Sequence, residues 1–201
     1  MKTGIYGGTF SPVHNGHISA ARAFADKLSL DRLIVIPAGI PPHKEVACGV
    51  TAEDRLNMAR LAFADEARTE VSDIEIKRGG KSYTLFTLDE LRTVGCDDIY
   101  LMCGSDMILT FESWYRFREV FEKCTVVYVP RDVKSHAACL AAIERYRRDY
   151  GAKIEVLDTV PYEISSTEIR AIIAAGGDAQ RYMPRREYEY ITERGLYKNG
   201  D

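Results

Sequence analysis

Short apolar runs alternate with amphipathic segments along the whole chain. The runs 33–36, 99–103 and 125–129 are continuous, which is typical of strands buried on both faces of a sheet. Between them, apolar residues recur every three or four positions, which is the spacing of helices with one buried face. Further strands are predicted at 3–6, 71–76 (half-exposed or at an edge) and 153–157, and helices at 18–28, 51–63, 85–91, 140–146, 167–175 and 184–194.

This alternation predicts a parallel sheet, because a parallel neighbour is reached through a crossover connection. We therefore predict the α/β class: a Rossmann-like, doubly wound parallel sheet with helices on both faces. No internal repeat, low-complexity tract or linker interrupts the pattern, so residues 1–201 are predicted to form a single domain. Ligands bind such sheets beyond the carboxyl ends of the strands, so the loops that follow the strands are the informative ones.

Composition excludes several classes. A formal net charge of -3 argues against a general nucleic-acid binder, because no excess of Lys and Arg exists to neutralise a phosphate backbone. No apolar run approaches the ~20 residues that span a bilayer, and the amino-terminal residues do not resemble a signal peptide. The five cysteines are scattered and form no CxxC pair, which favours free thiols in a reducing cytoplasm over a structural zinc site.

The segment after the first strand carries the first chemical signal. Gly7 and Gly8 are expected to allow positive φ and a close approach of a ligand. Ser11-Pro12 predicts a turn. His14 and His17 lie one helical turn apart at the start of a helix, where free N–H groups favour an anion. The arrangement suits a nucleotide phosphate.

The segment GGTFSPVHNGH at 7–17 resembles the GGTFxPxHxGH signature of the nucleotidyltransferase superfamily, which includes the nicotinate-mononucleotide adenylyltransferases. Family members commonly have Asp at the position of Ser11, and Ser can bond to nearby backbone as Asp does. The motif by itself leaves the acceptor open. The resemblance implies an ATP site that includes Gly7, Gly8, Thr9, Phe10, His14 and His17.

A second signal lies at the start of the helix 167–175. Ser165 and Glu168 have the spacing of a capping box. The same helix start offers N–H groups, hydroxyls and a guanidinium, which together suit a triphosphate. The stretch also resembles the superfamily's ISSTxIR motif, which implies that four residues hold the ATP phosphates opposite the two histidines: Ile164, Ser165, Ser166 and Arg170.

Two further loops offer cations. The prolines of PPHK stiffen the loop after the second strand and hold Lys44 in place, where its ammonium is either a phosphate ligand or an ordinary surface charge. PPHK resembles the mononucleotide-phosphate loop of the nicotinate-mononucleotide adenylyltransferases, which favours the first role. Arg131 follows the strand 125–129 and is a second candidate for a phosphate contact.

The start of the helix 85–91 has two compatible interpretations. Ser82 or Thr84 is expected to cap the helix, and its N–H groups are also able to receive an anionic ligand group. The SYT stretch resembles the family segment whose Thr backbone helps to hold the nicotinate carboxylate. That resemblance implies that Thr84 binds nicotinate mononucleotide.

The loop after the strand 99–103 leaves two alternatives open for each of two residues. Asp106 either accepts hydrogen bonds from a ribose or caps a helix that begins near Met107. Trp114 either fills the core or stacks on a flat heteroaromatic ring. The spacing GSDxxxxxxxW resembles the family's GTDxxxxxxxW. It implies that Gly104 and Asp106 belong to the ATP site, that Trp114 stacks on the pyridine ring, and that Tyr115 donates a backbone N–H to its carboxylate.

The implied reaction joins ATP and nicotinate mononucleotide to give nicotinate adenine dinucleotide and pyrophosphate. A phosphate dianion is already nucleophilic, so catalysis reduces to positioning and charge stabilisation by His14, His17 and Arg170. Mg²⁺ is expected to bridge the triphosphate oxygens, mostly through water, because the sequence shows no carboxylate cage for it.

Three alternatives remain at this stage. The first is an adenylyltransferase for nicotinamide mononucleotide or phosphopantetheine. The second is a dinucleotide-binding oxidoreductase, which the absence of GxGxxG after the first strand disfavours. The third is a non-catalytic nucleotide-sensing module. The expected partners are ATP and nicotinate mononucleotide, with no nucleic acid and no membrane, in the cytoplasm; the sequence leaves open whether the chain forms a homo-oligomer.

Overall fold

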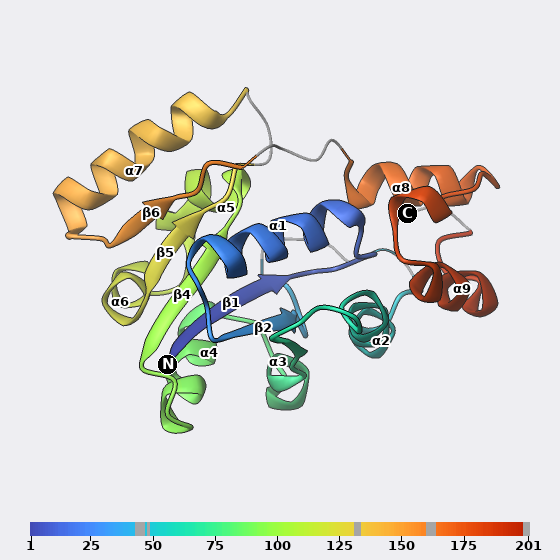
Figure 1. The fold of residues 1–201 in the computed structure, drawn as a ribbon, viewed down its shortest axis with the longest axis horizontal. Coiled ribbons are helices and arrows are strands. Elements are labelled where there is room, and N and C mark those ends of the chain that lie inside the picture. The colour runs from blue at the N-terminus through green and yellow to red at the C-terminus, as the bar shows by residue number, and fades with distance from the viewer. Residues whose placement is uncertain (43–46, 48, 131–133, 160–163, 199–201) are drawn as a thin grey trace. The chain divides into compact units, whose positions relative to one another are not determined.

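A computed structural model describes residues 1–42, 47, 49–130, 134–159 and 164–198 (Figure 1). Its strands are hydrogen-bonded in the order β3-β2-β1-β4-β5-β6. The chain therefore proceeds from β1 to β3 in one direction and from β4 to β6 in the other, which makes the boundary between β1 and β4 the switch point. The strands are β1 (Lys2–Gly8), β2 (Arg32–Pro37), β3 (Thr69–Val71), β4 (Asp98–Cys103), β5 (Thr125–Tyr128) and β6 (Ile154–Val156).

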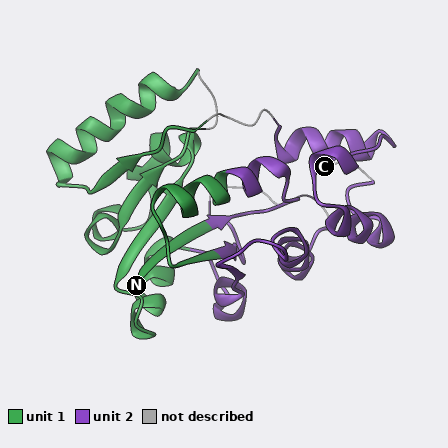
Figure 2. Cartoon of the chain, in the orientation of Figure 1, with its two compact units in different colours: residues 1–6, 20–34, 83–163 green, residues 7–19, 35–82, 164–201 purple. Residues whose placement is uncertain are grey.

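The chain divides into two compact units (Figure 2). Unit 1 consists of residues 1–6, 20–34 and 83–163, and unit 2 of residues 7–19, 35–82 and 164–201. The chain passes between the units within β1, within helix α1 (Asn15–Lys27) and within β2.

Unit 1 is built on parallel strand pairs. β1 pairs with β4, β4 with β5 and β5 with β6, all in parallel. The register places four apolar side chains in one row across these strands, and all four are buried: Ile5, Leu101, Val126 and Ile154. A row of this kind explains the continuous apolar runs, because a parallel sheet with both faces covered exposes neither set of side chains.

The helices of unit 1 pack in pairs. Helix α4 (Thr84–Thr93) packs on α6 (Phe117–Lys123), and α5 (Ser105–Thr110) packs on α7 (His136–Tyr150). The 3₁₀ helix η1 (Phe111–Ser113) follows α5 directly. The carboxyl-terminal half of α1 also belongs to this unit, and a Cβ at Gly4 of β1 would lie 2.8 Å from the ring of Phe24 in α1. Only glycine permits this close approach of helix and strand.

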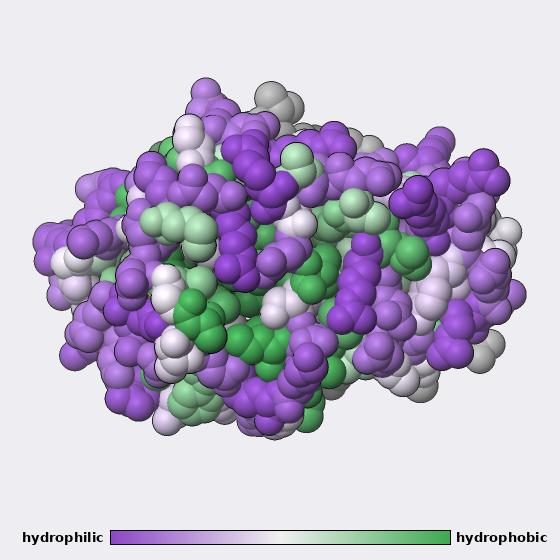
Figure 3. Space-filling view, turned by 60° about the horizontal axis from the view of Figure 1, so that its bottom comes forward, coloured by the Kyte–Doolittle hydropathy of each residue, from purple (hydrophilic) through white to green (hydrophobic). Residues whose placement is uncertain are grey.

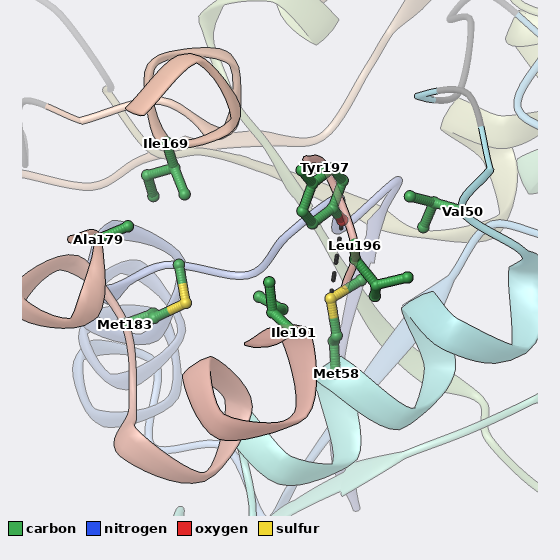
Figure 4. Packing of buried hydrophobic residues seen from close by; sticks show 8 residues of the cluster. All are labelled: Val50, Met58, Ile169, Ala179, Met183, Ile191, Leu196 and Tyr197. Atoms are coloured by element: carbon green, nitrogen blue, oxygen red, sulfur yellow. Dashed lines mark hydrogen bonds between the residues drawn. The ribbon is translucent and has the colours of Figure 1, made fainter. Parts of the chain in front are cut away.

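Unit 2 holds the remaining helices: α2 (Ala52–Ala62), α3 (Ile74–Arg78), α8 (Ser166–Ala174), the 3₁₀ helix η2 (Gln180–Tyr182) and α9 (Arg185–Arg194). Its core joins α2, α8 and α9, and Figure 4 shows the buried cluster. Within it, the Tyr197 hydroxyl lies 3.7 Å from the Met58 sulfur. The members of the cluster are Val50, Met58, Ile169, Ala179, Met183, Ile191, Leu196 and Tyr197.

One predicted strand is wrong. The segment predicted as a strand at 71–76 is a strand only to Val71, and α3 begins at Ile74. Ser72 and Asp73 end the strand, because side chains of these types bond to nearby backbone and favour helix starts. The N–H of Ile74 donates to the Ser72 hydroxyl at 3.4 Å, and the N–H of Lys77 donates to the Asp73 carbonyl at 2.9 Å. An alternating pattern of six residues is too short to distinguish a continuous strand from a strand end followed by a short helix.

No helix in the described part of the chain is long and apolar enough to cross a membrane. The face seen in Figure 3 is predominantly hydrophilic, with patches of hydrophobic residues between the polar ones. The predicted α/β class is confirmed.

Candidate functional site

The turn between β1 and α1 differs from the expectation for its glycines. Gly7 and Gly8 are extended, and the positive φ of this segment lies at Phe10 (52°). A Cβ at Gly8 would lie 2.8 Å from the Phe10 ring, whereas a Cβ at Gly7 would have no heavy atom within 4 Å. The prediction of positive φ at the glycines is therefore wrong: Gly8 makes room for an aromatic ring, and Gly7 leaves open space beside the strand end.

The two histidines lie together at the start of α1. Their ring centroids are 3.7 Å apart at 35°, and the Phe10 ring meets the His17 ring edge-on at 5.3 Å. The N–H of His14 donates to Nδ1 of His17 at 3.2 Å, so the proton of a neutral His17 resides on Nε2. His17 Nδ1 thus occupies the acceptor position of a capping box.

Helix α8 begins on the turn that precedes the histidines. Ser166 Oγ donates to the Pro12 carbonyl at 2.9 Å, and Arg170 Nη1 donates to the Ser11 carbonyl at 3.0 Å. The predicted capping box is present: the Glu168 N–H donates to Ser165 Oγ, and the Ser165 N–H donates to the Glu168 carboxylate. Ser165 Oγ also donates to the Glu168 carboxylate at 2.6 Å. This bond and the one from the Ser165 N–H lower the pKa of Glu168, and the electrostatic effect of His14 acts in the same direction. The two motifs therefore meet in unit 2.

A buried arginine that was not predicted holds the strand ends. Arg55 in α2 donates from Nη1 to the carbonyls of Thr9 and Ala38, and from Nη2 to that of Gly39 at 2.8 Å. Burial lowers its pKa, and the charge of Glu75 opposes this effect. A signal existed in the sequence, because Arg55 lies four residues before Ala59 on the apolar face of its helix.

Two more buried groups in the carboxyl-terminal segment were not predicted. Oε1 of Glu187 in α9 accepts the N–H of Val13 at 2.9 Å, and the hydroxyl of Tyr197 lies 3.0 Å from that of Ser11. Burial raises the pKa of both groups, that of Glu187 well above its usual range. Glu187 precedes Ile191 by four residues, so the two side chains lie on the same buried face of α9. A carboxyl on the apolar face of a predicted helix was the sequence signal for this residue.

In unit 1, Thr84 is the first residue of α4, but the predicted caps are wrong. The N-cap is Tyr83, which makes no side-chain capping bond. Ser82 instead accepts the N–H of Gly39 on its hydroxyl at 2.8 Å. Ser82 lies close to the start of α4 in the sequence, but its hydroxyl bonds to a segment that is distant in sequence, which a local pattern does not reveal.

The Gly104–Asp106 segment begins α5. Gly104 is the N-cap and Asp106 is an exposed residue of the first turn, so the alternative in which Asp106 caps the helix is wrong. A carboxylate in the first turn still favours the positive end of the helix dipole. The ribose role of Asp106 stays a prediction.

The neighbouring residues Trp114 and Tyr115 stack on different partners. Half-buried Trp114 stacks on Phe111 at 4.5 Å and 13°, while Tyr115, which is 42% exposed, stacks on Tyr83 at 4.7 Å and 29°. Because Tyr83 immediately precedes Thr84, the structure brings the SYT and Trp114-Tyr115 segments together. Phe86 lies 5.6 Å from the Tyr115 ring and completes an exposed aromatic group.

Three candidate residues remain: Lys44, Arg131 and Ile164. Lys44 and Arg131 lie outside the described residues. Ile164 packs against the core cluster of unit 2. Within the described part of the chain, no group of three or more His, Cys, Asp or Glu side chains is arranged to hold a metal ion.

Fold and site together define the class. A switch-point sheet whose first strand leads into paired imidazoles, faced by a capped helix with a guanidinium, is the arrangement of a nucleotidyltransferase. The model of the cytidylyltransferase-like family matches residues 5–172. Relatives that match over nearly their full length show the particular family: the chain belongs to the nicotinate-nucleotide adenylyltransferases.

A probable nicotinate-nucleotide adenylyltransferase of Geobacter metallireducens is 37% identical over 98% of each chain. One of Clostridium tetani is 35% identical over 98% of this chain and 99% of its own. Among solved structures, the nicotinic acid mononucleotide adenylyltransferase of Plasmodium falciparum complexed with NaAD has a TM-score of 0.80 at 18% identity, covering 100% of this chain and 99% of its own. The last similarity concerns the fold alone.

Proposed function

We propose that the protein transfers the adenylyl group of ATP to nicotinate mononucleotide, forming nicotinate adenine dinucleotide and pyrophosphate in NAD biosynthesis. The observation that carries this is the meeting of two motifs in unit 2: Ser166 and Arg170 of α8 bind the turn that leads into His14 and His17. Membership in the nicotinate-nucleotide adenylyltransferases supports the same conclusion.

The chemistry requires one displacement at phosphorus. The 5′-phosphate of nicotinate mononucleotide attacks the α-phosphorus of ATP, a new P–O bond forms, and the bond to the β-phosphate oxygen breaks. Pyrophosphate leaves with the electron pair. No general base is needed because the attacking phosphate is already ionised, so positioning and charge stabilisation supply the catalysis.

His17 is the group we assign to the transferring phosphate. Its Nδ1 accepts the His14 N–H, which fixes the orientation of the ring and places the proton of the neutral form on Nε2. A preorganised donor stabilises charge that develops in the transition state without further reorganisation. His14, Ser165, Ser166 and Arg170 are assigned to the other phosphate oxygens, at helix starts whose N–H groups favour anions.

Gly7, Gly8, Thr9, Phe10 and Ile164 are also assigned to ATP binding, and Gly104 and Asp106 are assigned to the nucleoside of ATP. Mg²⁺ is proposed to travel with ATP on the phosphate oxygens. The proposal follows from the chemistry of Mg²⁺, which is usually bound through substrate phosphates and water and not by an all-protein cage.

We assign the choice of acceptor to unit 1. The start of α4 at Thr84 offers backbone N–H groups to the nicotinate carboxylate, with the N–H of Tyr115 as a second donor and the Trp114 ring for stacking. A carboxylate is favoured over an amide there because N–H donors bind an anionic acceptor more strongly. Lys44 and Arg131 remain predicted phosphate ligands.

The test compares acceptors. The purified protein is incubated with ATP and Mg²⁺ and with nicotinate mononucleotide, nicotinamide mononucleotide or phosphopantetheine, and pyrophosphate release is measured. Release with nicotinate mononucleotide is expected to be the fastest. No release with nicotinate mononucleotide contradicts the proposal, and a preference for the amide reverses the assignment of the acceptor. Cytoplasmic location remains a prediction, and the oligomeric state is left open.

A further inference from the structure

The turn at 11–13 receives its hydrogen bonds from the carboxyl-terminal segment of unit 2. The carbonyl of Ser11 accepts from Arg170 at 3.0 Å, and that of Pro12 accepts from Ser166 at 2.9 Å. The N–H of Val13 donates to Glu187 at 2.9 Å. Three successive residues, immediately before His14, are thus each held by a side chain more than 150 positions away in the sequence.

The bond to Val13 replaces one that the turn would ordinarily form by itself. In a turn of this kind, an Asp, Asn or Ser side chain bonds to the N–H two residues on. Ser11 is two residues before Val13, but its hydroxyl lies 3.0 Å from that of Tyr197. The Val13 N–H therefore receives its acceptor from α9 instead of from Ser11.

Glu187 is an unusual acceptor because of where it lies. The residue is fully buried, and its Oε2 has no hydrogen-bond partner among the described residues. Burying a carboxyl costs free energy unless the group is neutral or well paired. The raised pKa of Glu187 agrees with a neutral carboxyl. In either protonation state, Oε1 of Glu187 is an acceptor for the Val13 N–H.

We propose that Glu187 is a positioning residue. Its buried carboxyl, which comes from α9, accepts the Val13 N–H in the way that a carboxyl at position 11 would do within the turn. By holding the Val13 N–H, Glu187 positions His14 and His17. The inference rests on the proposed function for its catalytic consequence. The claim that Glu187 holds the Val13 N–H does not depend on the proposed function. A misplacement of a catalytic group by about 1 Å can cost as much as 10²-fold in rate.

The first experiment distinguishes the role of Glu187 as a hydrogen-bond acceptor from its contribution to packing. Glu187→Gln keeps a carbonyl oxygen for Val13 but buries an amide, whereas Glu187→Met keeps an unbranched side chain of similar length and removes the acceptor. We expect Glu187→Gln to retain kcat within about threefold, and Glu187→Met to lower kcat by about tenfold or more with little change in the KM for nicotinate mononucleotide. Thermal unfolding is measured for both, so that turnover is compared with stability.

The second experiment restores the acceptor from within the turn. Ser11→Asp is introduced into the Glu187→Met protein, and it is expected to return kcat to within about threefold of the wild-type value. Hydrogen exchange of the Val13 amide, followed by NMR, supplies a readout apart from turnover. Protection is expected to fall about tenfold in Glu187→Met and to recover in the double variant.

Three results overturn the proposal: equal kcat in Glu187→Met and wild type, unchanged protection of the Val13 amide, or no recovery on adding Ser11→Asp. If Glu187→Met does not fold, Ser11→Asp must restore folding, and a double variant that stays unfolded also overturns it. Failure of the proposed function is distinct, because then the wild-type protein shows no turnover while the exchange measurement still reports on Val13.

Discussion

At the scale of single residues, buried polar side chains of unit 2 bind the backbone of the turns. Arg55 bonds to the carbonyls of Thr9, Ala38 and Gly39, and Glu187 bonds to the Val13 N–H. Such bonds contribute little net stability relative to water, but an unpaired buried group costs about 1–3 kcal/mol. The backbone before the histidines is therefore held in one conformation, as positioning catalysis requires.

Removal of the His17 imidazole tests its assignment. His17→Ala is expected to lower kcat by about 10²-fold or more, because loss of one preorganised donor to a transition-state oxyanion has an effect of that size. Steady-state pyrophosphate release measures the effect. His136→Ala is the control for the loss of an imidazole, since His136 begins α7, stacks on Tyr128 and is not assigned to a phosphate. Turnover of His17→Ala within threefold of wild type contradicts the assignment.

Glu187 also predicts a dependence of stability on pH. The unfolded side chain ionises near its ordinary value of 4.5, whereas burial keeps the folded carboxyl protonated to higher pH. The unfolded state thus loses its proton first, so this group's contribution to folding falls as pH rises above about 4.5, by up to about 1.4 kcal/mol per pH unit.

The comparison is between wild type and Glu187→Gln, which does not titrate. The free energy of unfolding of Glu187→Gln minus that of wild type is expected to grow with pH from about 4.5 upward, measured by urea titration at several pH values. A constant difference across pH 4 to 8 would show that the folded carboxyl ionises normally.

At the scale of elements, some helix ends carry local signals that agree with the structure, whereas the caps predicted for α4 and α5 are wrong. Thr51 and Asp54 form the reciprocal capping box that begins α2, and Gly95 and Gly195 follow α4 and α9 with positive φ. Pro184 is the N-cap of α9, one residue before its predicted place. α3 was missed because its five residues carry too short a pattern.

The capping box of α2 supports a stability prediction. Thr51→Ala removes the acceptor for the Asp54 N–H, which lies 3.0 Å from Thr51 Oγ1, and is expected to lower the free energy of unfolding by about 1 kcal/mol. Chemical denaturation measures the loss, with Thr51→Ser as the control that keeps the hydroxyl. Equal destabilisation by both variants would assign the effect to lost packing of the Thr methyl group.

At the scale of the whole molecule, ligand binding and folding are linked. If ATP binds the folded protein alone, it stabilises the protein by about 2.7 kcal/mol at a hundred times its Kd. Mg²⁺-ATP is therefore expected to raise the Tm of wild type, and to raise it much less in Arg170→Ala. Arg186→Ala is the control, because Arg186 is exposed on α9 and pairs with exposed Asp65. Equal shifts in all three proteins contradict the role of Arg170.

The sequence by itself determined the α/β class, most strands and helices, and the two motifs of unit 2. These depend on periodicity, caps and short signatures, which are local properties. Tertiary structure alone decided that Gly7 and Gly8 are extended, that Ser82 contacts Gly39, and that the Val13 N–H pairs with Glu187. The physical reason is that a backbone group accepts whichever partner packing brings within about 3 Å, and that partner is unrelated to sequence distance.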